Sequence, residues 1–78
     1  MTKLYIGAGR EERVNPGDLV GAICNETNLT GKDIGAIDIF GRFSLVEVPK
    51  KRSRAVIEAL RGTTIRGRRV DVRPDRYA

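Results

Sequence analysis

The chain has 78 residues, a length that suits one domain burying only about 60% of its unfolded surface. Its 15 Lys and Arg outnumber its 10 Asp and Glu, and the net charge of +5 favours a polyanionic partner or an acidic membrane surface, with simple solubility as the alternative. The chain has no histidine and a single cysteine, Cys24, which excludes an intrachain disulfide, the usual metal clusters and a catalytic triad.

The segment Lys3–Ala8 alternates apolar and other residues, which predicts a strand covered on one face. Leu4 and Ile6 belong to the covered side. Tyr5 falls on the outward side, where a half-buried strand usually shows a polar residue, so its ring either packs on the sheet or binds a ligand. The polar residues 9–14 that follow are expected to form a loop.

A helix is predicted to begin at Asn15, because Asn is a favoured N-cap, Pro16 suits the first helical position and Asp18 suits the first turn. Apolar residues recur at helical spacing along it, and they are Leu19, Val20, Ile23 and Cys24. This stripe predicts that Cys24 is a core residue rather than a reactive one.

A hairpin is predicted from residue 36 to residue 48, where two alternating segments flank Gly41-Arg42 and glycine at the first loop position suits a type II′ turn. Phe40 would then lie opposite Phe43. The residues expected on the core face are Ile37, Ile39, Ser44, Val46 and Val48. The residues expected on the open face are Asp38, Phe40, Phe43, Leu45 and Glu47.

A second amphipathic helix is predicted from the spacing of Ser53, Val56, Ile57 and Leu60, ending near Gly62. A last strand is expected over residues 68–73, with its valines in the core and with Arg69, Asp71 and Arg73 facing outward. Residues 73–78 would form a short tail. The order βαββαβ predicts an α+β, ferredoxin-like sandwich in which two helices cover one face of a four-stranded antiparallel sheet.

Three stretches of the sequence resemble the RNA recognition motif (RRM). They are "LYIGAG" at residues 4–9, "RFSLVEV" at residues 42–48 and "LRGTTIRGRRVDV" at residues 60–72. Tyr5 and Phe43 match aromatic positions of that motif, whereas Leu45 and Val48 stand where further aromatic residues are common. The resemblance implies the RRM-like βαββαβ fold and RNA binding.

The chain also resembles the DbpA-type RNA-binding domain at the C-terminus of bacterial DEAD-box RNA helicases, through "LYIGAGR", "PGDLVGAI", "DIGAIDI", "FSLVEVP" and "LRGTTIRGRRVDVR". This resemblance implies that residues 1–78 are one accessory domain, a C-terminal fragment of a larger helicase, that targets a helicase core in the same parent chain to structured RNA. The implied target class is a hairpin of large-subunit ribosomal RNA. The domain itself would be no enzyme and need no cofactor, while ATP and Mg would serve the parent's core.

Predicted RNA-binding residues are aromatic side chains of the open face and basic side chains of loops and element ends. They are Tyr5, Arg10, Arg13, Lys32, Phe40, Arg42, Phe43, Lys50, Lys51, Arg66, Arg68, Arg69 and Arg73. Bases stack on exposed rings, and arginine suits bidentate phosphate contacts. Acids on the same open face would repel phosphate unless nearby cations offset them, and these acids are Asp38, Glu47 and Asp71.

Several alternatives remain open at this stage. The rings could shield the sheet or pack under the tail, and Lys50–Arg54 could be a solvated helix face. The whole domain could instead be a ferredoxin-like protein-interaction or dimerisation module that uses Phe40, Phe43 and Leu45 as an apolar patch. The oligomeric state is left open. No apolar run approaches the roughly 20 residues that span a bilayer, and the start "MTKLYIG" lacks a secretory apolar region, so a cytoplasmic location is expected.

Overall fold

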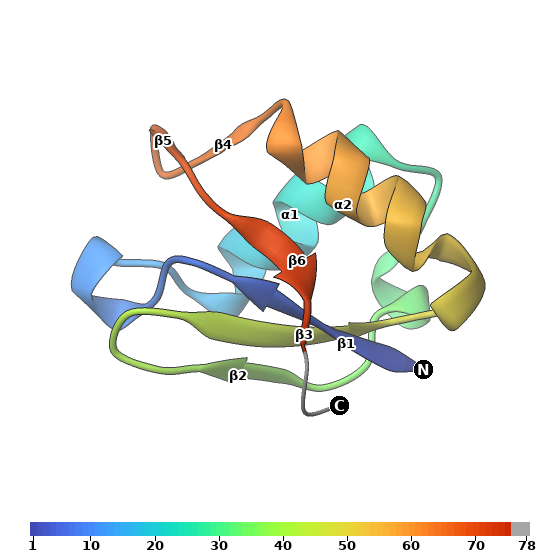
Figure 1. The fold of residues 1–78 in the computed structure, drawn as a ribbon, viewed down its shortest axis with the longest axis horizontal. Coiled ribbons are helices and arrows are strands. Elements are labelled where there is room, and N and C mark those ends of the chain that lie inside the picture. Colours follow the sequence, from blue (N-terminus) through green and yellow to red (C-terminus); the bar gives the residue numbers. More distant parts are fainter. Residues whose placement is uncertain (76–78) are drawn as a thin grey trace.

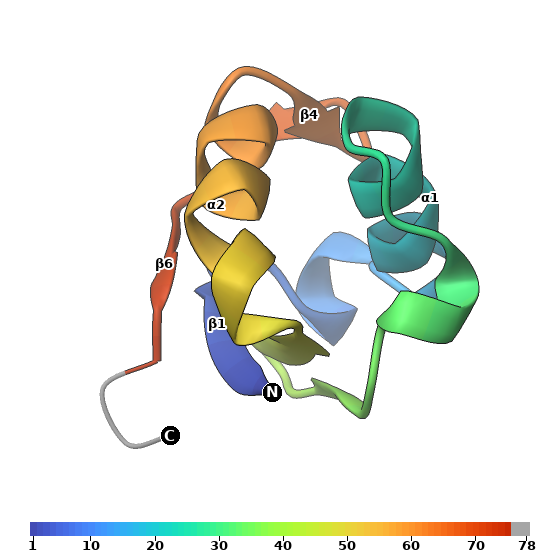
Figure 2. The same ribbon diagram turned by 90° about the vertical axis from the view of Figure 1, so that its right-hand side faces the viewer.

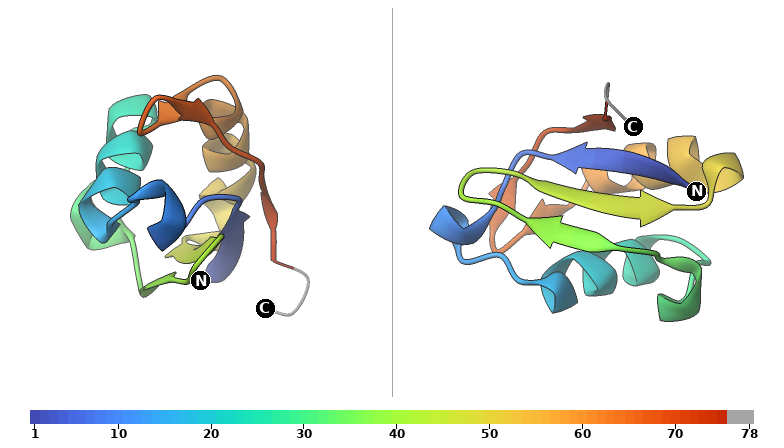
Figure 3. Two further views of the ribbon diagram at one scale, coloured as in Figure 1. Left: turned by 90° about the vertical axis from the view of Figure 1, so that its left-hand side faces the viewer. Right: turned by 90° about the horizontal axis from the view of Figure 1, so that it is seen from below.

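The computed structural model describes residues 1–75 and contains four strands joined in one antiparallel sheet, with two helices on one face (Figure 1). The helices and strands are β1 (Thr2–Ile6), α1 (Pro16–Glu26), β2 (Ile37–Ile39), β3 (Ser44–Val48), α2 (Ser53–Arg61), β4 (Thr64–Ile65), β5 (Arg68–Arg69) and β6 (Val72–Pro74). Single-turn 3₁₀ helices also occur, and they are η1 (Arg10–Glu12), η2 (Gly31–Asp33) and η3 (Lys50–Arg52). The sheet order β2-β3-β1-β6 leaves one face open (Figure 3, right), which confirms the predicted α+β, RRM-like sandwich.

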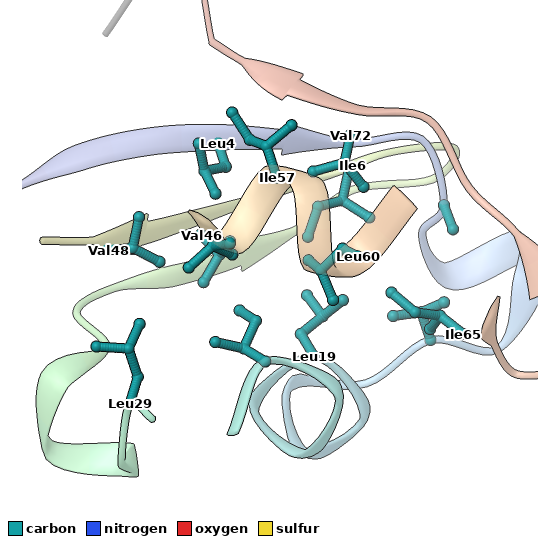
Figure 4. Packing of buried hydrophobic residues seen from close by; sticks show 14 residues of the cluster. Leu4, Ile6, Leu19, Leu29, Val46, Val48, Ile57, Leu60, Ile65 and Val72 are labelled. Atoms are coloured by element: carbon teal, nitrogen blue, oxygen red, sulfur yellow. The ribbon is translucent and has the colours of Figure 1, made fainter. Parts of the chain in front are cut away.

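The core lies between the sheet and the two helices (Figure 4). Leu4 and Ile6 of β1 point toward α2, where Leu60 is fully buried. Leu19 of α1 is fully buried on the other side of the core. Burial of each such side chain stabilises the fold by about 1.5–3 kcal/mol. The buried hydroxyl of Ser44 is satisfied because its Oγ donates to the carbonyl oxygen of Ala8 at 2.7 Å.

Helix α1 begins as the sequence predicts. The Oδ1 atom of Asn15 accepts a hydrogen bond from the amide of Asp18, and the amide of Asn15 donates to Oδ2 of Asp18, both at 3.0 Å. Pro16 occupies the first helical position, where its missing N–H costs nothing. This reciprocal cap fixes the start of the helix and therefore the direction of the chain between η1 and α1.

The β2–β3 hairpin has the predicted register, because Ile37 pairs with Val46 and Ile39 pairs with Ser44. Its predicted turn type is wrong. A type II′ turn needs a positive φ at Gly41, and among residues 1–75 the one glycine with a positive φ is Gly67. The turn is held by the neighbouring loop, which donates backbone hydrogen bonds to the carbonyl oxygens of residues 40 and 41 at 2.8 and 2.9 Å.

The predicted last strand, residues 68–73, is divided in two. Arg69 pairs with Thr64 in the small β4–β5 hairpin, and only β6 joins the main sheet. The cause is a tight turn in which both Arg66 (φ 55°) and Gly67 (φ 78°) have positive φ, as the hairpin turn that suits twisted strands requires. Arg69 is exposed, as predicted, but its predicted place in the main sheet is wrong. Arg76 and the rest of the predicted tail beyond residue 75 lie outside the described residues.

Candidate nucleic-acid interface

Three rings stand side by side on the open face of the sheet and form what we call the aromatic row: Tyr5, Phe43 and Phe40. The ring centroids of Tyr5 and Phe43 are 5.4 Å apart with planes at 15°, and those of Phe43 and Phe40 are 4.7 Å apart at 22°. The row thus runs from β1 across to the end of β2. Such offset pairs contribute about 0.5–1.5 kcal/mol beyond their burial, so the row is a packed unit.

One end of the row is covered and the other is open. The guanidinium carbon of Arg73 lies 4.3 Å from the Tyr5 ring centroid. Because β6 and β3 flank β1 on opposite sides, Arg73 and Phe43 contact Tyr5 from opposite sides. Phe40 is 42% exposed and is the one exposed ring in the part of the chain that the structure describes. Tyr5 is therefore half-buried between two neighbours, and Phe40 is the accessible end of the row.

Two of the three acids expected to repel phosphate on this face are engaged by neighbours. The Oε1 atom of Glu47 accepts a hydrogen bond from the amide of Ala36 at 2.9 Å. Asp71 forms an ion pair with Arg73, with Nη1 and Oδ2 3.1 Å apart, so Arg73 offsets the charge of this acid. Asp38 is exposed on β2. A hydrogen bond from an amide leaves Glu47 charged, so the remaining repulsion comes from Glu47 and from Asp38, which lies on the edge strand β2.

Arginines from three loops lie at one end of the molecule, where η1, the β2–β3 turn and the β4–β5 hairpin come together (Figure 3, left). We call this set the arginine end, and it comprises Arg10, Arg13, Arg42, Arg66 and Arg68. The amide of Arg10 donates to the carbonyl oxygen of Phe40 at 2.8 Å. The Nε atom of Arg66 lies 3.2 Å from the carbonyl oxygen of Arg13 and 3.4 Å from Oδ2 of Asp18.

A hollow of about 420 Å³ opens between these loops, lined by Glu11, Glu12, Arg13, Arg66 and Arg68. Its acids already have partners. Glu12 accepts a hydrogen bond from the amide of Gly9 at 2.7 Å, and Oε2 of Glu11 lies 3.4 Å from Nε of Arg42. The side chains of Glu11 and Arg42 are 57% and 85% exposed, and such a surface pair contributes at most about 1 kcal/mol. Glu11 therefore holds Arg42 only weakly.

Gly9 allows η1 to lie against the β2–β3 turn. A Cβ atom at this position would lie 2.2 Å from the carbonyl oxygen of Phe40 and 2.8 Å from the amide nitrogen of Phe43. Only glycine permits this approach, which places Arg10 beside Phe40. Sequence reasoning missed the role of Gly9, because the contact joins residues more than thirty positions apart and no local pattern marks it.

The predicted lysines lie elsewhere. Lys32 is on η2, and Lys50 and Lys51 are on η3, at the opposite end of the long axis (Figure 2). All three are exposed, and we call them the lysine end. Arg69 is exposed on β5. All the predicted basic residues except Arg69 and Arg73 therefore form two separate groups, and of these groups only the arginine end adjoins an exposed ring.

Comparisons with known proteins identify the family and support the fold. A family model described as the DbpA RNA binding domain matches residues 3–74. The chain belongs to the DbpA RNA-binding domain family. Its similarity to one solved structure, titled as the crystal structure of RNA binding protein PG1, has a TM-score of 0.74 at 22% identity and covers 97% of this chain and 95% of that one, which supports the fold.

Curated relatives of this family member are named as helicases. The chain is 42% identical over 97% of its length to the ATP-dependent RNA helicase DeaD of Mycobacterium tuberculosis. It is 32% identical over 94% of its length to the ATP-dependent RNA helicase DbpA of Escherichia coli, and 30% identical over 90% to that of Bacillus subtilis. The chain spans 14%, 16% and 15% of these three proteins, respectively, so it matches a small part of each.

Two kinds of feature are absent from residues 1–75. No group of three or more His, Cys, Asp or Glu side chains in that range could hold a metal ion. None of the helices described there is long and apolar enough to cross a membrane.

Proposed function

We propose that this chain is the RNA-binding accessory domain of a longer DEAD-box helicase, with residues 1–78 forming one domain that brings the helicase core to structured RNA. Family membership supports the RNA-binding role, and the small share of each helicase relative that the chain spans supports a place within a longer protein. ATP and Mg would be bound by the core. This domain would contribute affinity and position, and no chemistry.

The observation that carries the proposal is the arginine end beside Phe40. Arginine presents a planar fork of donors that matches a phosphate, and its charge does not depend on pH in the physiological range. Phosphate contacts position a protein on RNA, while unpaired bases stack on aromatic rings. The domain brings both types of group together at one end, with Arg10 hydrogen-bonded through its amide to Phe40.

Structured RNA fits this arrangement better than an extended single strand. A single strand laid across the sheet would need free ring faces for its bases, yet Tyr5 lies between Arg73 and Phe43. The phosphates of such a strand would also approach Asp38. A rigid hairpin instead offers backbone phosphates to peripheral arginines and one or two unpaired bases to an exposed ring. We extend the proposal to a hairpin of large-subunit ribosomal RNA in the cytoplasm, as the DbpA-type resemblance implies, and so to ribosome biogenesis.

A direct competition tests this function. The 78-residue chain is titrated at moderate salt with a ribosomal-type hairpin and with an unstructured RNA of the same length and composition. We expect the hairpin to bind more tightly. Equal affinities would indicate nonspecific polyanion binding, and absence of binding to either RNA would favour the alternative function, a protein-interaction module that uses Phe40, Phe43 and Leu45.

A further inference from the structure

The aromatic row offers a stacking surface at only one of its ends. Tyr5 is contacted by Arg73 on one side and Phe43 on the other, and Phe43 is in turn contacted by both other rings. Phe40 has a ring partner only in Phe43 among residues 1–75, and it is 42% exposed. A base can therefore extend the row at Phe40 without separating rings that already pack together.

Positive charge surrounds this open end. The amide of Arg10 donates to the carbonyl oxygen of Phe40 at 2.8 Å, so the backbone of η1 lies against that of Phe40, and the side chain of Arg10 is exposed at this end of the row. Arg42 follows Phe40 by two residues, and its side chain is 85% exposed. Every nucleotide within an RNA chain has a phosphate on each side of its base. Two exposed arginines near Phe40, Arg10 and Arg42, thus suit a nucleotide whose base stacks on the ring.

We propose that Phe40 stacks with a single unpaired base of the bound RNA, with Arg10 and Arg42 holding the flanking phosphates. This inference rests on the proposed function and specifies its site: the domain takes one base at the end of the row, and Tyr5 supports the row without contacting RNA. Because every base has a π-face, the stack selects an unpaired nucleotide and does not select its identity.

A thermodynamic cycle tests the proposal with the 78-residue chain. The probe is an RNA hairpin with a four-nucleotide loop, in which each loop base is removed in turn to leave an abasic site. We expect one abasic position to weaken binding by the wild-type chain by about fivefold to 150-fold, the range that corresponds to one base stacked on a ring. The same abasic site should not weaken RNA binding by Phe40→Leu any further, because this variant has no ring on which the base can stack.

Two variants serve as controls. Tyr5→Leu changes the covered end of the row and should keep the full sensitivity to the abasic site, and Phe40→Tyr retains a ring and should bind like the wild type. The proposal would be overturned if Phe40→Leu and every abasic site lowered RNA affinity independently of each other. It would also be overturned if binding by Tyr5→Leu were as insensitive to the abasic site as binding by Phe40→Leu. If the wild-type chain binds no hairpin at all, both the proposed function and this inference fail. If it binds the hairpin but Phe40→Leu and the abasic sites act independently, only this inference fails.

Discussion

The guanidinium of Arg73 covers the ring of Tyr5, with its central carbon 4.3 Å from the ring centroid, and the two residues are directly opposite each other in the β1–β6 register. The same guanidinium pairs with Asp71. One side chain thus covers a ring and compensates an acid on the open face. This contact ties the short edge strand β6 to β1, and it indicates that Tyr5 serves mainly the stability of the sheet.

The first prediction separates stability from affinity along the aromatic row. Tyr5→Leu should lower the free energy of unfolding by about 1–2 kcal/mol, because it removes a ring pair and a cation–π interaction, and should change RNA affinity little. Phe40→Leu removes one ring pair and should have the smaller effect on unfolding and the larger effect on affinity. Urea denaturation and RNA titration of both variants measure the two quantities. The reverse ranking would show that RNA uses the covered end of the row.

The second prediction concerns the salt dependence of binding. Replacing Arg10, Arg13 and Arg68 by glutamine should reduce the slope of log affinity against log salt concentration, by about 0.7–0.9 for each RNA phosphate that the variant no longer neutralises. The three side chains are exposed, so the fold should be unaffected. RNA titrations at several salt concentrations give the slope.

The matched control replaces the same number of charges at the lysine end, with Lys32, Lys50 and Lys51 changed to glutamine. The slope should fall much less, since these residues lie away from the exposed ring and the net charge changes equally in both variants. A larger fall for the lysine variant would move the phosphate-binding groups to the opposite end of the molecule.

Much of the fold follows from local patterns in the sequence. Alternation fixes the register of the β2–β3 hairpin, because a shift by one residue would turn Ile37 and Val46 out of the core. Asn15, Pro16 and Asp18 predict the start of α1, because capping involves only neighbours in the chain. The structure confirms both predictions. They were possible because each depends on residues within one element or one hairpin.

The features that could not be predicted depend on contacts between distant residues or on unusual backbone angles. The β4–β5 hairpin needs a positive φ at Arg66, which few residues other than glycine adopt, so "RRVDVR" alone resembles one continuous strand. The division of the basic residues into two ends is a property of the topology, because η1 and the β4–β5 turn are more than fifty residues apart. The predicted RNA contacts of individual residues stay predictions until binding is measured.

The third prediction tests the helix cap. Asn15→Ala removes the side-chain acceptor for the amide of Asp18 and should lower the free energy of unfolding by about 1 kcal/mol. Asn15→Ser retains an acceptor and should cost much less. Thermal or urea denaturation of the two variants measures the difference. Equal stability of Asn15→Ala and the wild type would mean that water or Asp18 replaces the cap.

The last prediction concerns the glycine that joins the loop of η1 to the hairpin turn. In Gly9→Ala the new Cβ atom would overlap the carbonyl oxygen of Phe40, and backbone atoms cannot move aside as a flexible side chain can. We expect the free energy of unfolding to fall by about 1–3 kcal/mol, the range for overpacked sites. RNA affinity should also fall, because Arg10 would be displaced from the exposed ring.

Gly21→Ala is the matched control for this variant. No atom lies within 4 Å of a Cβ built at Gly21, and alanine within a helix is about 0.5–1 kcal/mol more stable than glycine. This variant should therefore be stabilised and should bind RNA like the wild type. Urea denaturation and hairpin titration of both variants provide the measurement. If Gly9→Ala were as stable as the wild type and bound RNA equally well, the close contact between η1 and the β2–β3 turn would not be needed, and Arg10 and Phe40 could not be regarded as one site.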